Sequence, residues 1–174
     1  FKSLPKFLNI MANHVIIAAA GKSARMGADS NKVFLPLLNK PMLYYTIKAF
    51  EDCSAIDDIV IVTKKEDIEK INNIKNQYNF KKIKNIVEGG NERQDSVHNG
   101  LMSIKNAVNV NENDIILVHN GSNPLVKENE IIECINAAKE HGAAVVGFPV
   151  RDTLKEAKDN SIVKTIDRSN LWHM

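Results

Sequence analysis

An α/β fold, with a mostly parallel sheet covered by helices on both faces, is predicted by the order of patterns along this chain. Continuous apolar runs, typical of buried parallel strands, alternate with segments of helical spacing. The 174 residues are 44% hydrophobic and 25% charged, a balance that suits one globular domain with one core. Ligands of such folds bind in loops at the carboxyl ends of the strands, so functional residues are expected there.

Each strand is predicted from an apolar run and each helix from the spacing of its apolar residues. The runs that predict strands cover residues 14–20, 58–63, 85–88, 114–119 and 143–150. The segments with helical spacing cover residues 41–50, 65–77, 92–107 and 127–141. Gly21 follows the first run and Gly89 follows the third, and each marks a place where a tight turn can begin.

The two ends of the chain depart from this alternation. Residues 1–11 are predicted to be a disordered or non-native leader, and residues 12–174 the domain, because Met11 stands directly before the first strand-like run. A signal peptide is the alternative, but the segment has no small-residue cleavage site. Beyond Val150 the chain becomes charged and polar, and Trp172, the only tryptophan, needs a core or a partner to cover it.

Composition argues against several classes of function. The net charge of +2 and the absence of a long basic run argue against binding to nucleic acid. No stretch approaches the roughly 18 apolar residues that span a bilayer, so no membrane association is expected. Cys53 and Cys134 have no C-x-x-C spacing, which favours reduced thiols in a cytoplasmic protein over a disulfide.

The first loop combines small residues with positive charge. It reads Ala18-Ala19-Ala20-Gly21-Lys22-Ser23-Ala24-Arg25-Met26-Gly27, and Lys32 follows it. Small residues let the backbone approach a nucleotide, and Arg25 and Lys32 can bind phosphates. The spacing excludes the dinucleotide-binding fingerprint and the Walker A loop, which need glycine or lysine at positions that hold other residues here. Alone, the loop could also be a strand-to-helix turn with surface lysines.

A second loop again places glycines at a strand end and polar side chains at the start of a helix. It reads Gly89-Gly90-Asn91-Glu92-Arg93-Gln94-Asp95-Ser96-Val97. This pattern is expected of a loop that recognises a base or a ribose. For Asp95 alone, a favourable negative charge at a helix N-terminus is an equally good explanation.

With the segments 149–155 and 167–172, these loops make the chain resemble the 2-C-methyl-D-erythritol 4-phosphate cytidylyltransferases. The four motifs come in the family's order, but the family's chains continue beyond residue 174. The resemblance implies a Rossmann-like nucleotide-diphospho-sugar transferase fold, a dimerisation arm at about residues 150–170, a homodimer, and Mg²⁺ as cofactor. It also implies transfer of a cytidylyl group from CTP to 2-C-methyl-D-erythritol 4-phosphate, a sugar-alcohol phosphate, with release of pyrophosphate, in non-mevalonate isoprenoid biosynthesis.

The resemblance also implies roles for single residues. Arg25 and Lys32 correspond to the catalytic cations that hold the triphosphate. Thr153 and Arg168 correspond to residues that grip the substrate phosphate across a dimer interface, a role that suits a guanidinium, although Arg168 could instead be a surface residue paired with Asp167. No metal ligand is assigned. The residues implied to bind the nucleotide are Ala19, Ala20, Gly21, Gly90, Asn91, Ser96, Asn120 and Gly121.

This sequence departs from the family's pattern at several functional positions. Asn91 replaces a common aspartate, but its amide can still bind a base edge or the ribose. Asn120 stands where the family has an aspartate near the ribose and the metal, so Mg²⁺ handling is expected to be weaker. Asn123 replaces an arginine that contacts the substrate phosphate. Asn31 stands where the family usually has proline before its lysine, and this change is expected to loosen the loop.

Two alternatives stay open. A ribitol-5-phosphate cytidylyltransferase has the same fold and reaction, but Gly100-Leu101 and Asp152-Thr153 with their neighbours look more like the methylerythritol enzyme. A catalytically impaired relative that only binds nucleotide would explain Asn120, although retention of Lys32 and the other cations argues against it. A dinucleotide-dependent oxidoreductase is disfavoured by the glycine spacing.

Overall fold

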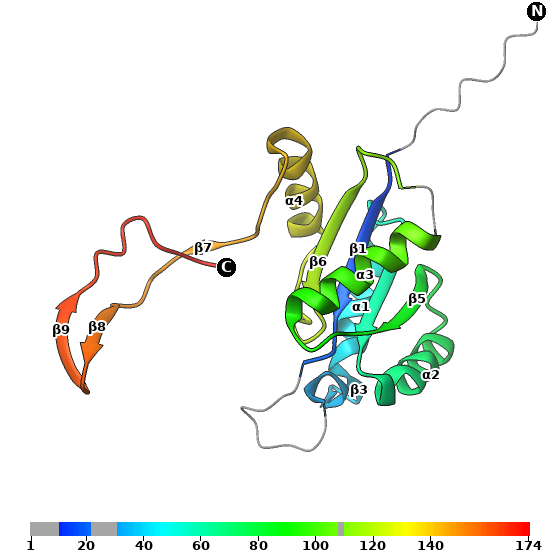
Figure 1. The fold of residues 1–174 in the computed structure, drawn as a ribbon, viewed down its shortest axis with the longest axis horizontal. Helices are drawn as coiled ribbons and strands as arrows, with labels where there is room; N and C mark the ends of the chain where they lie inside the picture. Colours follow the sequence, from blue (N-terminus) through cyan, green and yellow to red (C-terminus); the bar gives the residue numbers. More distant parts are fainter. Residues whose placement is uncertain (1–10, 22–30, 108–109) are drawn as a thin grey trace, which may run out of the picture.

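The computed structural model describes residues 11–21, 31–107 and 110–174, and its centre is a four-stranded parallel sheet (Figure 1). The strands lie in the order β5-β4-β1-β6, with every neighbouring pair parallel. Helices cover both faces of the sheet, which confirms the predicted α/β class. The four strands are β1 (Asn13–Ala18), β4 (Asp58–Thr63), β5 (Ile83–Glu88) and β6 (Ile115–Asn120).

β1 is the central strand, and its continuous apolar sequence follows from burial on both faces. Val15 pairs in register with Ile59 of β4 on one side and with Leu117 of β6 on the other. Val15, Ile16 and Ile17 are all fully buried. A strand with helices on both faces has no side that needs polar residues, which is why no alternation marks it in the sequence.

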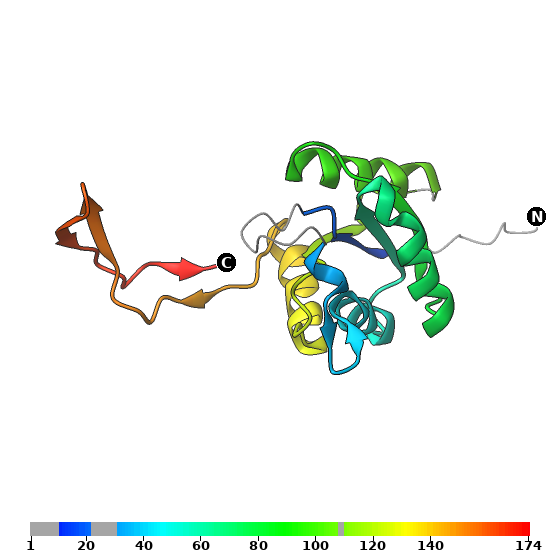
Figure 2. The same ribbon diagram turned by 90° about the horizontal axis from the view of Figure 1, so that it is seen from below.

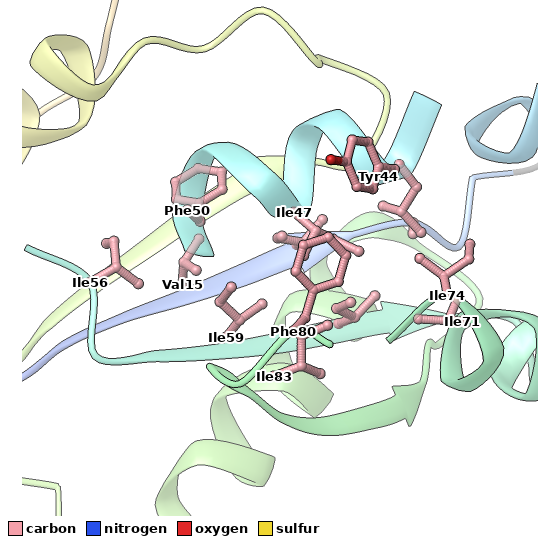
Figure 3. Packing of buried hydrophobic residues seen from close by; sticks show 14 of the residues in the cluster. Val15, Tyr44, Ile47, Phe50, Ile56, Ile59, Ile71, Ile74, Phe80 and Ile83 are labelled. Atoms are coloured by element: carbon pink, nitrogen blue, oxygen red, sulfur yellow. The ribbon is translucent and has the colours of Figure 1, made fainter. Parts of the chain in front are cut away.

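Alternate strand residues face two different helical layers, seen edge-on in Figure 2. On one face, Val15 and Ile59 pack in the large core with Phe50 of α1, as Figure 3 shows. On the other face, Ile16 packs in a smaller cluster with Ile104 of α3. The large core also receives residues of α2 and α4. The helices are α1 (Met42–Asp52), α2 (Ile68–Tyr78), α3 (Arg93–Ala107) and α4 (Glu128–His141).

Short elements complete the domain between these helices and strands. The segment predicted as one helix over 65–77 is divided into a 3-10 turn, η3 (Lys65–Asp67), and α2. After the first loop come the 3-10 turn η2 (Lys32–Phe34) and a small hairpin of β2 (Pro36–Leu37) and β3 (Lys40–Pro41). Among the helices of the described ranges, none is long and apolar enough to cross a membrane.

Polar side chains join the strands at the amino edge of the sheet, opposite the loops that carry the motifs. The two carboxylate oxygens of Asp114 accept hydrogen bonds from the backbone N–H groups of Ala12 and Asn111, both at 2.8 Å. His14 lies between Asp58, at 3.3 Å, and Asp114, at 3.7 Å. Burial alone would raise the pKa of Asp114, but these N–H groups and His14 outweigh burial and hold the pKa below its usual value.

An extension leaves the domain after α4 and projects away from the sheet (Figures 1 and 2). Its inner part is a short antiparallel pair, and its outer part is a hairpin with a turn at Asp159 and Asn160, both of positive φ. The strands of the extension are β7 (Phe148–Pro149), β8 (Lys155–Lys158), β9 (Ser161–Thr165) and β10 (Trp172–His173).

The buried strand predicted for residues 143–150 is wrong. Only β7 forms there, and Val145 and Val146 are 66% and 54% exposed. A strand buries its side chains only where neighbouring strands pair with it and another layer covers it. Within the described part of the chain, β10 is the only strand paired with this run, so most of its apolar side chains face solvent. Trp172 is likewise 59% exposed.

Candidate active site

The carboxyl ends of β1, β5 and β6 meet at one edge of the sheet, and the first loop begins there. The backbone N–H of Ala19 donates to Val62 at 2.7 Å, and the N–H of Gly121 donates to Ala18 at 2.8 Å. These two bonds hold the residues after β1 between the ends of β4 and β6. Ala19 is buried, while Gly21 is exposed at the start of the loop.

The second loop lies directly against the first. A Cβ atom added to Gly89 would meet Ala20 Cβ at 2.9 Å and Ser96 Oγ at 2.8 Å, so only glycine fits between them. The Ser96 hydroxyl accepts from the N–H of Gly90 at 3.1 Å and donates to the carbonyl of Glu92 at 3.2 Å. Three residues predicted to bind nucleotide, Ala20, Gly90 and Ser96, are therefore brought together.

Asp95 has a structural role in this loop. Its carboxylate accepts a hydrogen bond from the backbone N–H of Glu92 at 3.0 Å, just before α3 begins. A Cβ atom on Gly90 would lie 2.2 Å from Asp95 Cβ, so the tight path of the loop requires glycine there. The explanation of Asp95 as a charge at a helix N-terminus fits this contact, and Asn91 beside it is exposed.

Gly121 directly follows β6 and lies on the other side of the first loop from Gly89. A Cβ atom there would meet Ala19 Cβ at 3.2 Å and Leu43 Cδ1 at 3.3 Å. The carbonyl of Gly121 accepts a hydrogen bond from the hydroxyl of Thr46 at 2.9 Å, in a fully buried position on α1. Gly121 is thus fixed by α1 and lies against the first loop.

Asn120 is joined to the second loop by the side chain of Arg93, for which the sequence predicts no role. Arg93, at the first position of α3, donates from Nη1 to Asn120 Oδ1 at 2.6 Å. In the sequence, the only signal for this contact is the place of Arg93 within the glycine-rich loop of residues 89–97. Because the guanidinium occupies the amide oxygen, and an amide carries no negative charge, Asn120 is a poor ligand for Mg²⁺.

The described residues offer no preformed cluster of ligands for a metal ion. Within them, no group of three or more histidine, cysteine, aspartate or glutamate side chains is placed to hold a metal. Asn120 would be the nearest counterpart of the carboxylate that the resemblance implies, and Arg93 binds its oxygen. A metal at this edge would therefore have to be held mainly by oxygens of a bound nucleotide.

His119 shapes the turn that follows β6. Its Nε2 lies 2.9 Å from the carbonyl oxygen of Asn123, which can only accept, so this nitrogen carries the proton. The imidazole meets the ring of Phe50 edge-on, with 5.0 Å between centroids. Burial lowers the pKa of His119, and the carbonyl of Asn123 opposes this only in part. Since the acceptor is a backbone carbonyl, this hydrogen bond does not depend on which side chain stands at position 123.

Lys32 lies at the beginning of η2, directly after Asn31, and is half-buried. The expectation that Asn31 loosens the loop concerns residues 22–30, which lie outside the described residues, so it stays a prediction. Asn31 is buried, accepts from the N–H of Val33 at 3.4 Å, and donates to the carbonyl of Ala19 at 2.7 Å. Arg25, the other predicted cation, lies outside the described residues.

Thr153 and Arg168 are not brought to this edge by their own chain. Both are exposed on the extension, which points away from the loops (Figure 1). Arg168 donates to the backbone carbonyl of Arg151. Asp167 accepts from the hydroxyl of Ser169 at 2.6 Å, and this bond and the Ser169 N–H lower the pKa of Asp167. Asp167 is thus hydrogen-bonded to Ser169 and Arg168 to Arg151, so these contacts do not support the alternative in which Arg168 pairs with Asp167.

An open groove of about 930 Å³ runs from this edge along β6 and α4. Arg93 and Asn120 line one end of the groove, and apolar residues such as Leu117 and Ile131 line its length. The outer edge of β6 is not paired with another strand in the described residues. The contact between Arg93 and Asn120 therefore lies at a groove that runs beside the half-exposed strand β6.

The comparisons with known proteins agree with this arrangement. The sequence profile of the 2-C-methyl-D-erythritol 4-phosphate cytidylyltransferase family matches residues 13–174. The chain is 42% identical over 166 residues to the protein of that name from Alkaliphilus oremlandii, covering 94% of this chain and 68% of the relative. It is 46% identical over 160 residues to the one from Clostridioides difficile, covering 91% and 65%.

Solved structures show the same similarity in three dimensions. A crystal structure of 4-diphosphocytidyl-2C-methyl-D-erythritol synthase superimposes with a TM-score of 0.76 at 28% identity, covering 93% of this chain and 71% of that one. The Francisella tularensis 2-C-methyl-D-erythritol 4-phosphate cytidylyltransferase gives a TM-score of 0.70 at 31% identity, covering 93% and 69%. This chain spans about two thirds of the length of its curated relatives. The chain belongs to the 2-C-methyl-D-erythritol 4-phosphate cytidylyltransferase family.

Proposed function

We propose that this chain binds CTP at the edge where β1, β5 and β6 end and transfers its cytidylyl group to 2-C-methyl-D-erythritol 4-phosphate. The observation that carries the proposal is the convergence of the two glycine loops. Gly89 packs against both Ala20 and Ser96, while Gly121 packs against Ala19 from the other side. In a chain of this family, such a surface of small residues and backbone groups suits a nucleotide that must be approached closely.

In the proposed reaction, a phosphate oxygen of the sugar-alcohol phosphate attacks the α-phosphorus of CTP. A new P–O bond forms there, the bond from the α-phosphorus to the oxygen shared with the β-phosphorus breaks, and pyrophosphate leaves with the electron pair. Little covalent chemistry is left for the protein, so positioning and charge dominate. Lys32 is the proposed catalytic cation among the described residues, and Arg25 stays a prediction from the sequence.

The nucleotide contacts are proposed from position. Ala19, Ala20 and Gly21 would follow the triphosphate, and Gly90 and Ser96 would meet the base or the ribose. Asn91, Asn120 and Gly121 complete the proposed set. We propose that Mg²⁺ binds to the phosphates of CTP, since position 120 carries an amide bound to Arg93 and not a carboxylate.

A homodimer is part of the proposal because the substrate-phosphate residues lie away from their own site. Thr153 and Arg168 project on the extension, and Phe148 and Trp172 at its base are 60% and 59% exposed. Aromatic side chains this exposed are typical of a surface that a partner covers. A second copy could therefore receive the extension, which would serve as the dimerisation arm. Free thiols at Cys53 and Cys134 support a cytoplasmic location.

The first experiment measures pyrophosphate release from CTP and Mg²⁺ with either 2-C-methyl-D-erythritol 4-phosphate or ribitol 5-phosphate. Turnover with the first substrate alone is expected. Ribitol phosphate as the better substrate would replace the proposed activity with its alternative. CTP binding without turnover of either would indicate an impaired nucleotide-binding relative.

Asn120→Asp tests the effect of the missing carboxylate. The variant is expected to lower the Mg²⁺ concentration needed for half-maximal rate by about tenfold, because a carboxylate can hold the metal or its water directly. Asn72→Asp is the matched control, since Asn72 is exposed on α2, away from the candidate site, and its amide donates to the carbonyl of Ile68. Equal Mg²⁺ dependence in the wild type and Asn120→Asp would contradict a metal-related role for this position.

A further inference from the structure

One buried asparagine joins the beginning of the first loop to its end. The side-chain amide of Asn31 donates to the carbonyl oxygen of Ala19 at 2.7 Å and to Asp67 Oδ2 at 3.2 Å. Asn31 and Asp67 are only 6% and 3% exposed. The amide nitrogen carries two protons, and the two acceptors account for both of them.

The same side chain fixes the turn that contains Lys32. Asn31 is the N-cap of η2, and its backbone has φ −66° and ψ 120°. Its Oδ1 accepts from the N–H of Val33 at 3.4 Å, and its carbonyl accepts from the N–H of Phe34 at 3.1 Å. The residue that precedes Lys32 is thus held by the end of β1 and by the start of η2 together.

Asp67 provides the fixed acceptor on the far side. It lies at the end of η3, before α2, and its other oxygen accepts from Lys70 at 3.1 Å. Lys70 also lies over the ring of Phe34, 5.3 Å from its centroid. A buried polar group is costly without hydrogen-bond partners, and the Asn31 amide and the Lys70 ammonium together supply donors to this carboxylate.

We propose that Asn31 is a positioning residue, which sets Lys32 relative to the strand end that carries Ala19. The inference rests on the proposed function, in which Lys32 stabilises negative charge on the phosphates of CTP during transfer of the cytidylyl group. Proline at position 31 would fix φ as well, but it has no amide to donate to Ala19 or Asp67. In this chain, the hydrogen bonds of Asn31 to Ala19 and Asp67 take the place of the proline ring. They fix the distance between Asn31 and Ala19, whereas a proline would fix only the φ angle of residue 31.

Asn31→Ala tests the inference against a matched control, Asn13→Ala. Asn13 is also a buried asparagine whose amide donates to a backbone carbonyl, that of Ala55 at 2.8 Å, but it lies at the opposite end of β1. Both variants are expected to unfold at a lower urea concentration than the wild type. Only Asn31→Ala is expected to lower kcat, by about tenfold or more, because misplaced catalytic groups act on the transition state.

The KM and the equilibrium Kd for CTP separate positioning from general damage. For Asn31→Ala both constants are expected to change by less than about threefold, because the ground-state contacts of the nucleotide come mostly from other residues. A kcat for Asn31→Ala equal to that of Asn13→Ala would overturn the inference. So would a loss that appears entirely in KM.

Asn31→Ser covers the case in which the alanine variant folds poorly. Serine caps a helix as well as asparagine does, but it is too short to reach both Ala19 and Asp67. Its kcat is expected to fall with that of Asn31→Ala although the cap is kept. Wild-type kcat in the serine variant would show that capping alone suffices and would end the proposal.

The failure of this inference differs from the failure of the proposed function. A wild-type protein that turns over CTP, beside an Asn31→Ser variant that does so equally well, rejects only the positioning role. A wild-type protein that neither binds CTP nor releases pyrophosphate rejects the proposed function, and the positioning role with it.

Discussion

Replacing Gly100 with alanine tests how closely α3 must lie on the sheet. A Cβ atom at this position would lie 2.8 Å from Cγ2 of Ile16 and 3.1 Å from Cγ2 of Val62. Both neighbours are fully buried β-branched residues on the central strands, and such side chains cannot rotate away. The clash can be relieved only if α3 moves away from the sheet.

Two opposing effects set the magnitude. Alanine in place of glycine inside a helix stabilises it by about 1 kcal/mol. Overpacking of a tight core costs about 1–3 kcal/mol, and the upper half of this range applies because the shortest contact is to a methyl group that cannot move. We therefore expect Gly100→Ala to lower the free energy of unfolding by about 1–2 kcal/mol.

Urea unfolding, followed by circular dichroism, measures this change. His98→Ala is the control, since His98 is exposed on the same helix and should show a gain in helix propensity of about 0.5 kcal/mol without a clash. CTP affinity should also fall in Gly100→Ala, because Arg93 and Ser96 lie on the N-terminal turn of the displaced helix. A Gly100→Ala protein as stable as the wild type, or more stable, would refute the reasoning.

Two further substitutions test single contacts. Asp114→Asn should lower the free energy of unfolding at neutral pH by about 1–3 kcal/mol, since an amide cannot accept at both positions. Because the pKa of Asp114 is lowered in the folded state, its carboxylate stabilises the protein fully above the usual pKa of 3.8, and this stabilisation is lost as the pH falls through the folded-state pKa. The urea midpoints of the variant and the wild type should therefore converge in acid. A constant difference between them from pH 6 to pH 3 would contradict this. Thr46→Val removes the hydroxyl that donates to the carbonyl of Gly121. We expect this change to lower the free energy of unfolding by about 1–3 kcal/mol and to weaken CTP binding measured by calorimetry. Unchanged values would show that the hydroxyl is dispensable.

The central elements could be predicted because local patterns are enough to specify them. The run around Ile16 is apolar throughout, which favours a strand covered on both faces, and the structure confirms it as β1. The glycine loops were predicted as a site because Gly89 and Gly21 follow strands. Parallel strands bring their carboxyl ends to one edge whatever the details of packing.

The contacts that define the candidate site could not be predicted in the same way. Arg93 and Asn120 are 27 residues apart, and the packing of α3 on the sheet together with the pairing of β6 with β1 places them at 2.6 Å. The acceptors of the Asn31 amide could not be predicted either, because the sequence shows only that a proline is missing at this position. Long-range partners depend on register and packing, which no local pattern encodes.

The sequence alone determined the alternation of strands and helices, the two glycine loops and the family to which the chain belongs, because these rest on residues close together in the chain. Only the tertiary structure decided that Gly89 and Gly121 close on the first loop and that Thr153 and Arg168 lie away from it. It also decided that residues 143–147 stay exposed. Burial is a property of neighbours in space, so an apolar run predicts a strand's residues but not the elements that cover them.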